Sequence, residues 1–465
     1  MVPSRNESTT RRTLLAVVAG ATTGLAGCRS GKSGATPSES ETAVDATPSE
    51  SEPNPDDTPT ESEPRSGATP SESESSSGTP DETEQRCVAG EREVGSAPGS
   101  VDGAWSQFQA GPANTGYSVD ATGPTDPSLA WRYATCATLA DSPPVVAGGS
   151  VYVGGDSLRA FDAATGESEW RVEGITSPTA PVVTGDTVYF AGRDLVAVDR
   201  ADGTVVWRDG RESDILAFNS PTLADGTLYV PGAVDDPTVR AFDAATGEQR
   251  WELALDGEHG PRPPAVAGDR VYVTDWGDRL VSVGTDGGDT QVLAGGPDDP
   301  GVFSAPAVAD GTVYVGGLEG QVRAFDAATG EQRWARRLSE SGIPGPPVVG
   351  DGHLYVVEDG AVHALTTDGG QVWERPGEGD GLGLPVRAGD TLYVGGYTGR
   401  RADGSDPAGL LTALDVTDGS ERWSLETRGY WTDDGGRRAG TTAPVAVADG
   451  VVFAATGAGD LFAFG

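Results

Sequence analysis

The chain has 465 residues, of which 71 are Asp or Glu and 32 are Lys or Arg, so its formal net charge at neutral pH is −39. Nucleic acid requires a basic face, so this composition excludes DNA and RNA as partners. A uniformly acidic surface keeps a protein soluble, and we expect a monomer. Binding of polycations or divalent cations is the alternative reading of the same charge.

The first segment, residues 1–27, is predicted to be an export signal. Arg11 and Arg12 precede a short, modestly apolar run that ends in Leu-Ala-Gly before Cys28. The run falls short of the ~20 apolar residues that a membrane span needs. It resembles a twin-arginine signal followed by a lipobox, which implies that Cys28 carries a lipid and anchors the chain outside the cytoplasm, on the outer face of the cell membrane. An ordinary N-terminus is the alternative.

Residues 28–86 are predicted to form a solvated stalk without a fold. The sequence Ala-Thr-Pro-Ser-Glu-Ser occurs at 35, 46 and 68, and almost nothing apolar separates the copies. Such a segment buries too little to offset its conformational entropy, and its carboxylates repel one another. Its serines and threonines are candidate sites for sugars, which composition alone does not establish.

Two cysteines remain once Cys28 is assigned to a lipid. An even pair outside the cell predicts a disulfide between Cys87 and Cys136, joining the end of the stalk to the first strand of the domain. Two separate thiols are the alternative, because spacing along the sequence does not show that the residues meet. The three histidines form no cluster and no third cysteine has metal-ligand spacing, so no metal site is predicted.

From Trp105 onward the chain consists of repeats with a period of about 40 residues. Each unit has a proline-led strand, a Gly/Asp turn, a Val-Tyr-Val strand, a variable loop, a strand ending in Phe-Asp, a Thr-Gly turn and a strand with Trp. Four short strands with Gly at the turns are typical of a β-propeller blade. The eight units start at Pro144, Pro181, Pro221, Pro264, Pro306, Pro347, Pro385 and Pro444.

The last two strands of each unit form the most regular element. Ala241–Trp251 returns almost unchanged at Ala160–Trp170 and Ala324–Trp334, with looser copies at Ala197–Trp207 and Ala413–Trp423. Its Asp can accept backbone hydrogen bonds and its Gly supplies a positive φ, so each copy predicts a hairpin. A tryptophan at one fixed place is explained by packing between blades. The expected docking residues are Trp131, Trp170, Trp207, Trp251, Trp334, Trp373 and Trp423.

The two ends of the repeat region complete one another. The eighth unit stops at Gly465 after three strands and has no tryptophan strand, whereas residues 129–133, Leu-Ala-Trp-Arg-Tyr, precede the first unit. Pairing of 129–133 in the last blade would close the ring and remove an open sheet edge. We therefore predict an all-β domain at 87–465, an eight-bladed propeller.

Two units depart from the pattern. In the fourth, Ser282–Val292 keeps the spacing but places Val292 where the tryptophan belongs. Thr285 follows Gly284 there, and the Asp of the hairpin motif is missing from its expected position. In the sixth, Ala364–Trp373 is one residue short. We interpret both as structural degeneracy, with functional specialisation as the alternative.

The hairpin motif Ala-x-Asp-x-x-Thr-Gly-x-x-x-Trp resembles the tryptophan-docking motif of the quinoprotein (PQQ) dehydrogenase propellers. The wider family of PQQ-like repeat proteins, which includes BamB-like assembly lipoproteins, shares it. Residues 105–116 are similar to the segment that opens many such domains, so the resemblance covers about 105–465. Lys32 is the single lysine of the chain, and this acidic, lysine-poor composition resembles that of haloarchaeal secreted proteins.

The resemblance implies two classes of function. Quinoprotein dehydrogenases hold PQQ on the ring axis between a Trp and a vicinal disulfide, with Ca²⁺ bound by Glu and Asn beside an Asp base. This chain has no adjacent cysteines, no evident acidic cluster with Asn partners and no long lid insertions. We therefore favour a non-enzymatic scaffold for a protein or ligand, with no catalytic residue and no cofactor. A dehydrogenase using PQQ and Ca²⁺, or another extracytoplasmic redox enzyme, is the alternative.

In a propeller, the loops between blades and those between second and third strands gather on one face, opposite the Thr-Gly turns. Arginines beside aromatic residues on that face are typical binding anchors. Alternatively, the arginines neutralise nearby carboxylates and order the loops, and His259 is a solvated loop residue rather than a lone acid or base. Phe218, Asn219, Arg262 and Phe303 accompany the candidates on these loops. The candidates are His259, Trp276, Arg279, Tyr397, Arg400, Arg401, Tyr430, Trp431, Arg437 and Arg438.

Overall fold

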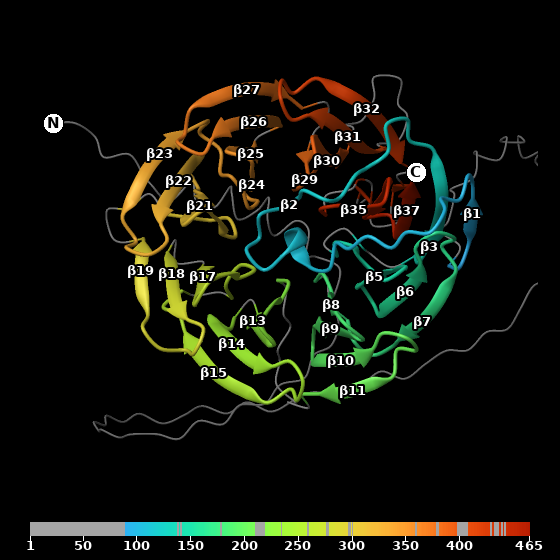
Figure 1. Cartoon of the computed structure of the whole chain (residues 1–465), viewed down its shortest axis with the longest axis horizontal. Helices are drawn as coiled ribbons and strands as arrows, with labels where there is room; N and C mark the ends of the chain where they lie inside the picture. The colour runs from blue at the N-terminus through green and yellow to red at the C-terminus, as the bar shows by residue number, and fades with distance from the viewer. Residues whose placement is uncertain are drawn as a thin grey trace, which may run out of the picture. The chain divides into compact units, whose positions relative to one another are not determined.

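The computed structural model describes most of the repeat domain (Figure 1). The described residues are 89–465 apart from 137–138, 140–141, 177–178, 210–218, 234, 258–259, 276–278, 296–298, 300, 359, 378–380, 398–407, 428–429, 432–436, 439 and 441–442. The predicted signal and stalk, with Arg11, Arg12, Cys28 and Cys87, lie outside them, so the boundaries 1–27 and 28–86 stay predictions. No helix among the described residues is both long and apolar enough to cross a membrane.

The predicted eight-bladed, all-β propeller is confirmed: the blades form a ring, and each is an antiparallel meander in sequence order (Figure 1). Blade 1 contains β4 (Val145–Ala147), β5 (Ser150–Val153), β6 (Leu158–Asp162) and β7 (Ser168–Val172). Blade 2 contains β8 (Val182–Thr184), β9 (Thr187–Ala191), β10 (Leu195–Asp199) and β11 (Val205–Arg208). Blade 3 contains β12 (Thr222–Ala224), β13 (Thr227–Pro231), β14 (Thr238–Asp243) and β15 (Gln249–Ala254). Blade 4 contains β16 (Ala265–Ala267), β17 (Arg270–Thr274), β18 (Leu280–Gly284) and β19 (Gln291–Ala294).

The second half of the ring repeats this plan. Blade 5 contains β20 (Ala307–Ala309), β21 (Thr312–Gly316), β22 (Gln321–Asp326) and β23 (Gln332–Arg337). Blade 6 contains β24 (Val348–Gly350), β25 (His353–Glu358), β26 (Ala361–Thr366) and β27 (Gln371–Pro376). Blade 7 contains β29 (Val386–Ala388), β30 (Thr391–Tyr397), β31 (Gly409–Asp415) and β32 (Glu421–Thr427), and β28 (Gly381–Leu382) pairs with β30. Blade 8 contains β35 (Ala446–Ala448), β36 (Val451–Ala455) and β37 (Asp460–Phe464).

The N-terminal part of the domain completes blade 8. Strand β3 (Leu129–Ala134) pairs antiparallel with β37, with Trp131 opposite Ala463, and β1 (Arg92–Val94) adds a fifth strand outside β3. Cys136, just after β3, is disulfide-bonded. The Gly90 N–H donates to the carbonyl of Ala134, two residues before Cys136. Cys87 itself is not described, and the predicted pairing with it stays a proposal.

The blades are held together by a repeated tryptophan contact. The indole N–H of one blade donates to a backbone carbonyl of the next at 2.8–3.0 Å, in the turn between the third and fourth strands or, for Trp423, at Pro124 ahead of β3. The turn glycine lies on the indole ring: a Cβ on Gly247 would stand 2.7 Å from the Trp207 ring. The donor–acceptor pairs are Trp131–Ala163, Trp170–Arg200, Trp207–Ala244, Trp251–Thr285, Trp334–Thr367, Trp373–Val416 and Trp423–Pro124.

The fourth unit does not have the register that its spacing suggests. Ser282 pairs with Tyr272, as Ala241 does with Tyr229, but Ser282 also pairs with Gln291, whereas Ala241 pairs with Trp251. The assignment of Val292 to the tryptophan position is therefore wrong, and Val292 is exposed. The physical reason is a shorter turn, closed by a hydrogen bond from Gly284 N–H to the Gly288 carbonyl. Blade 6 contains the same short turn and keeps its tryptophan.

A segment ahead of the first blade, residues 101–122, runs around the ring centre and is here called the axial segment (Figure 1). It contains η1 (Phe108–Ala110) and β2 (Tyr117–Ser118), which pairs in parallel with β29. Its backbone carbonyls accept the N–H of the middle residue of an inner strand in six blades: Val146, Val183, Val266, Val308, Val349 and Arg387. The sequence identified this segment only as an opening motif and did not indicate that it closes the centre of the ring.

Candidate binding face

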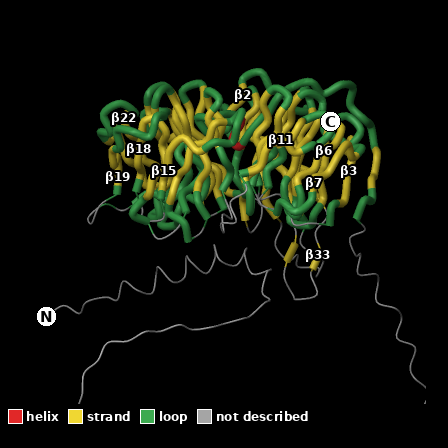
Figure 2. Tube along the Cα trace, turned by 90° about the horizontal axis from the view of Figure 1, so that it is seen from below, coloured by secondary structure: helices red, strands yellow, loops and turns green. Residues whose placement is uncertain are grey.

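The ring has two different faces. In each meander the first and third turns lie at one end of the blade, which we call the turn face, and the other connections lie at the opposite end, the loop face. The axial segment lies at the turn face, because Tyr117 donates to Asp351 and the backbone of Asp102 and Gly103 donates to Asp449, both in first turns. The connection from β32 to β35 holds β33 (Tyr430–Trp431) and β34 (Arg437–Arg438) and lies at the loop face. Figure 2 shows β33 beyond the ring on that side.

The candidate residues fall into three groups. His259, Trp276, Arg400 and Arg401 lie outside the described residues. Of the hairpin β33–β34 only the backbone is described, and it pairs Tyr430 with Arg438 and Trp431 with Arg437. Arg279 and Tyr397 are described in full.

Tyr397 ends β30, opposite Gly381 and Gly409. Arg279 is held in the loop of blade 4. Its guanidinium donates to Asp275 at 2.8 Å and to Asp256 at 2.6 Å, and its own N–H bonds to Asp275. The side chain of Asp275 is fully buried, so this pair supports the loop from inside.

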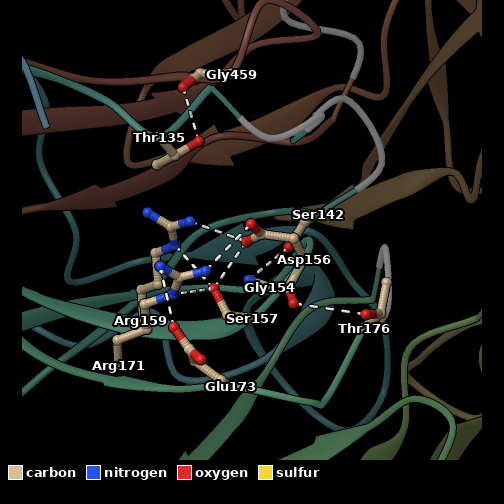
Figure 3. Close-up of polar contacts among 10 residues, drawn as sticks. All are labelled: Thr135, Ser142, Gly154, Asp156, Ser157, Arg159, Arg171, Glu173, Thr176 and Gly459. Carbon is tan, nitrogen blue, oxygen red and sulfur yellow. Dashed lines mark hydrogen bonds and ion pairs between the residues drawn. The ribbon is translucent and has the colours of Figure 1, made fainter. Parts of the chain in front are cut away.

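In blade 1, two arginines bind a carboxylate of the loop face (Figure 3). Asp156, in the loop between β5 and β6, accepts from Arg159 at 2.9 Å and from Arg171 at 3.3 Å. Ser157 Oγ donates to Asp156 at 2.7 Å and accepts from both arginines. Burial opposes ionisation of Asp156, but these hydrogen bonds and the charges of the two arginines outweigh it and lower its pKa.

The same arrangement recurs around the ring. A carboxylate of a loop-face connection binds an arginine of a third strand: Asp236, between the second and third strands of blade 3, binds Arg240 at 2.6 Å, and Asp299, in the connection between blades 4 and 5, binds Arg323. The pKa of Asp299 is lowered because hydrogen bonds from Arg323 and backbone N–H groups outweigh the cost of its burial. These strand arginines, like Arg279 in blade 4, therefore bind the carboxylates of the loop face.

Arg262 differs from these arginines. It stands at the end of the blade 3–4 connection, with its guanidinium 4.4 Å from the centre of the Phe303 ring and its Nε donating to the Phe303 carbonyl at 3.1 Å. Burial lowers its pKa to about 10, so it stays cationic at neutral pH. Two residues further along the chain, the Pro264 carbonyl accepts a hydrogen bond from Asn114 Nδ2 of the axial segment at 2.9 Å. A cation over an aromatic ring thus lies near the inner end of the loop face.

A Ca²⁺ site, which PQQ chemistry requires, needs ligand side chains that converge at one place. Within the described part of 89–465, no three His, Cys, Asp or Glu side chains converge so that they could hold a metal ion. A hard cation needs several oxygen ligands at one place.

The comparison with family models decides the identity of the repeats. A family model described as "Outer membrane protein assembly factor BamB" matches residues 64–214, 192–292 and 293–465. The chain belongs to this family. The eight tryptophan-linked blades are the structural counterpart of that match, and the PQQ-like repeat resemblance of the hairpins is confirmed.

Several curated relatives match part of the chain in sequence. It is 31% identical to the serine/threonine-protein kinase AfsK of Streptomyces griseus, over 44% of this chain and 26% of that protein. It is 28% identical to the quinohemoprotein alcohol dehydrogenase of Comamonas testosteroni, over 44% and 32%. It is 27% identical to BamB of Salmonella typhimurium, over 49% and 50%. The chain thus spans a quarter to half of the length of these relatives.

Solved structures share the fold. BamB from Moraxella catarrhalis superposes with a TM-score of 0.54 at 17% identity, over 73% of this chain and 97% of that one. The quinohemoprotein alcohol dehydrogenase from Comamonas testosteroni gives 0.61 at 14% identity, over 78% and 80%. At this identity the similarity supports the propeller fold alone, because one fold serves many functions.

Proposed function

We propose that the protein is a non-enzymatic propeller, anchored outside the cell by a lipid on Cys28, that binds a partner protein through the loop face of blade 7. The single observation that carries the proposal is the hairpin β33–β34, which interrupts the regular succession of blades. It lies beyond the ring, between β32 and β35 in the chain, and follows the blade whose β30, β31 and β32, of seven residues each, are the longest strands among those described.

The composition of the hairpin suits a protein interface. Its paired positions combine Tyr430 with Arg438 and Trp431 with Arg437. Tyr, Trp and Arg are the residue types that dominate binding energy in interfaces. The relatives named as assembly factors support a protein partner, since assembly acts on other proteins.

The N-terminal segments would set the location. A twin-arginine signal at 1–27, a lipid on Cys28 and an acidic stalk over 28–86 would hold the ring away from the membrane surface.

The experiment compares the full-length chain with two variants in its native cells. In one, residues 428–438 are replaced by a Gly-Ser linker; in the matched control, Glu340–Gly342 of the blade 5–6 connection are replaced in the same way. Cross-linking should recover a defined partner with the wild type and the control and lose it with the first variant. Recovery of the same partner from all three would overturn the proposal.

A PQQ-dependent dehydrogenase is the second candidate function, favoured by the similarity to quinohemoprotein alcohol dehydrogenase. A ligand that binds the folded state raises the melting temperature by mass action, by RT ln(1 + [L]/Kd) in free energy. A clear rise with PQQ and Ca²⁺ together, but with neither alone, would establish this function in place of the scaffold. No rise at saturating concentration leaves the scaffold.

A further inference from the structure

The hydrogen bond between the axial segment and the inner strand of blade 3 differs from those in the neighbouring blades. In blades 1 and 2, Trp105 and Ser106 accept the inner-strand N–H through backbone carbonyls, and in blade 4 Pro112 does the same. In blade 3 the N–H of Leu223 is bound at 3.0 Å by the side-chain oxygen of Gln107, whose Nε2 lies 3.4 Å from the Leu223 carbonyl. A side-chain amide thus occupies the place that backbone takes elsewhere.

The reason lies in the chain between Gln107 and Pro112. Gln109 and Ala110 have φ of 53° and 66°, a left-handed conformation that turns the chain sharply within η1. The turn leaves the upper end of blade 3 uncovered by backbone. A hollow of about 700 Å³ opens there, between the axial segment and blades 2, 3 and 4. Pockets that bind small ligands or short peptide segments have volumes of this order.

The hollow is lined by apolar and by charged residues. Pro112, Leu223 and Val266 are among the apolar ones, and the charged ones, here called the rim, are Asp225, Asp243 and Arg250. Asp243 is fully engaged, because one oxygen accepts two backbone N–H groups of the turn and the other binds Arg250 at 2.7 Å. Asp225 is exposed, and no described residue forms a hydrogen bond or ion pair with it. The rim therefore has one carboxylate in excess.

We propose that this hollow binds an extended, basic peptide segment of a partner protein. The Leu223 N–H and carbonyl are bound by the Gln107 amide, and a peptide group has the same donor and acceptor pair, so a bound segment would take the place of that side chain. The excess carboxylate of Asp225 selects an Arg or Lys side chain beside it, and the net charge of −39 attracts a basic segment from a distance. This site lies on the turn face, independent of the blade 7 hairpin.

The chain supplies matched controls for a test. Asp310 occupies in blade 5 the turn position that Asp225 occupies in blade 3, with φ of 48° and 45°, and Asn tolerates that conformation. Asp225→Asn and Asp310→Asn therefore remove the same charge from the same turn, and only the first alters the hollow. Ala245 lines the hollow and Ala328 is its counterpart in blade 5, so Ala245→Tyr fills the hollow and Ala328→Tyr does not.

The experiment is calorimetric titration of the full chain with the peptide acetyl-Gly-Arg-Val-Arg-Gly-amide, at low and high salt. We expect binding that Asp225→Asn weakens about threefold to fivefold, the range for one exposed ion pair, and that Asp310→Asn leaves unchanged. Ala245→Tyr should abolish binding while Ala328→Tyr preserves it. Melting temperatures of the four variants verify that each is folded.

Four outcomes would overturn the proposal. They are absence of binding by the wild type, equal weakening by Asp225→Asn and Asp310→Asn, equal binding of the peptide with Glu in place of Arg, and equal binding of methylguanidinium alone. The second would indicate general attraction to an acidic surface, and the last a site for small cations. Replacement of residues 428–438 should leave this titration unchanged. Failure of the proposal for the hollow can therefore be distinguished from failure of the proposal for blade 7.

Discussion

The contact between blades 4 and 5 differs from the other contacts around the ring. Elsewhere a tryptophan donates to a carbonyl of the next blade, and in six of these seven contacts a turn glycine lies on its ring. Between blades 4 and 5 the corresponding residue is Gln291, which donates to the Thr329 carbonyl at 3.0 Å, and the turn glycine Gly330 lies 2.8 Å from it at the Cβ position. The indole is absent there, yet the blades keep their spacing.

The carbonyl that an indole would bind is still satisfied. Tyr272 donates its hydroxyl to the Ala327 carbonyl at 3.0 Å, and Ala327 is the counterpart of Ala244, which Trp207 binds. In six other blades the equivalent tyrosine packs against the tryptophan of its own blade, with ring centres 5.8–6.2 Å apart. The comparison teaches that the interface requires a donor to this carbonyl more than it requires the indole, since a buried carbonyl left without one is costly.

Removal of a docking tryptophan should have the largest effect. Trp131 is fully buried in the blade that closes the ring, and it donates to Ala163 in blade 1. Trp131→Ala should lower the free energy of unfolding by about 3–5 kcal/mol, because it opens a cavity and orphans a carbonyl. Gln291→Ala, in the interface without tryptophan, should cost less than about 1 kcal/mol. Urea denaturation measures both, and equal losses would contradict the comparison.

The turn glycines provide a more finely matched pair. Gly247 and Gly330 have the same φ of 74°, so Ala at either position bears the same backbone strain. At Gly247 the new Cβ meets the rigid Trp207 ring at 2.7 Å, whereas at Gly330 it meets the end of the flexible Gln291 side chain. We expect Gly247→Ala to be the more destabilising by about 1–3 kcal/mol, the usual range for overpacking. Melting and urea midpoints should rank the two variants; the reverse order would show that strain alone decides.

The tyrosine hydroxyl should matter in one blade and hardly in another. Tyr272→Phe leaves the Ala327 carbonyl without its donor and should cost about 1–2 kcal/mol. Tyr229→Phe is the control, because Trp251 of the same blade already donates to Thr285. A cost for Tyr229→Phe as large as that for Tyr272→Phe would mean that the hydroxyl of Tyr272 is not a substitute for the missing indole.

A gain of stability tests the register. Gln291→Trp places an indole at the position that the strand pairing equates with Trp251, over a glycine that already has the required φ. We expect a gain of about 0.5–1.5 kcal/mol from packing against Tyr272. Val292→Trp, the substitution that sequence spacing alone would suggest, points to solvent and should give no gain. A gain with Val292→Trp and none with Gln291→Trp would contradict the observed register.

Sequence reasoning predicted the ring well and its centre poorly. Period, proline-led strands and tryptophan hairpins are local patterns, so the blade count and the part played by residues 129–133 could be read directly. The shortened turn of blade 4 was missed because a one-residue change in a turn shifts the register without changing the apparent spacing. The axial segment was missed because its bonds join Trp105–Thr122 to residues that are remote in sequence. The hollow over blade 3 depends on that path, so no local pattern indicates it.

The smallest effect concerns the aspartate that begins the hairpin turn in most blades and is replaced by Gly284 in blade 4 and by Thr366 in blade 6. In blade 5 this residue is Asp326, and hydrogen bonds from Arg333, from the Thr329 N–H and from the Thr329 hydroxyl hold its pKa below the ordinary value. A carboxylate whose pKa is lower when folded stabilises the fold above its unfolded pKa of about 3.9, and this contribution is lost as the pH falls below it. The melting-temperature difference between the wild type and Asp326→Asn should therefore be present at pH 6 and shrink towards pH 3. Asp310→Asn, an exposed carboxylate of the same blade, is the control. A difference for Asp326→Asn that is constant across this range would mean that the turn depends on the shape of its side chain and not on its charge.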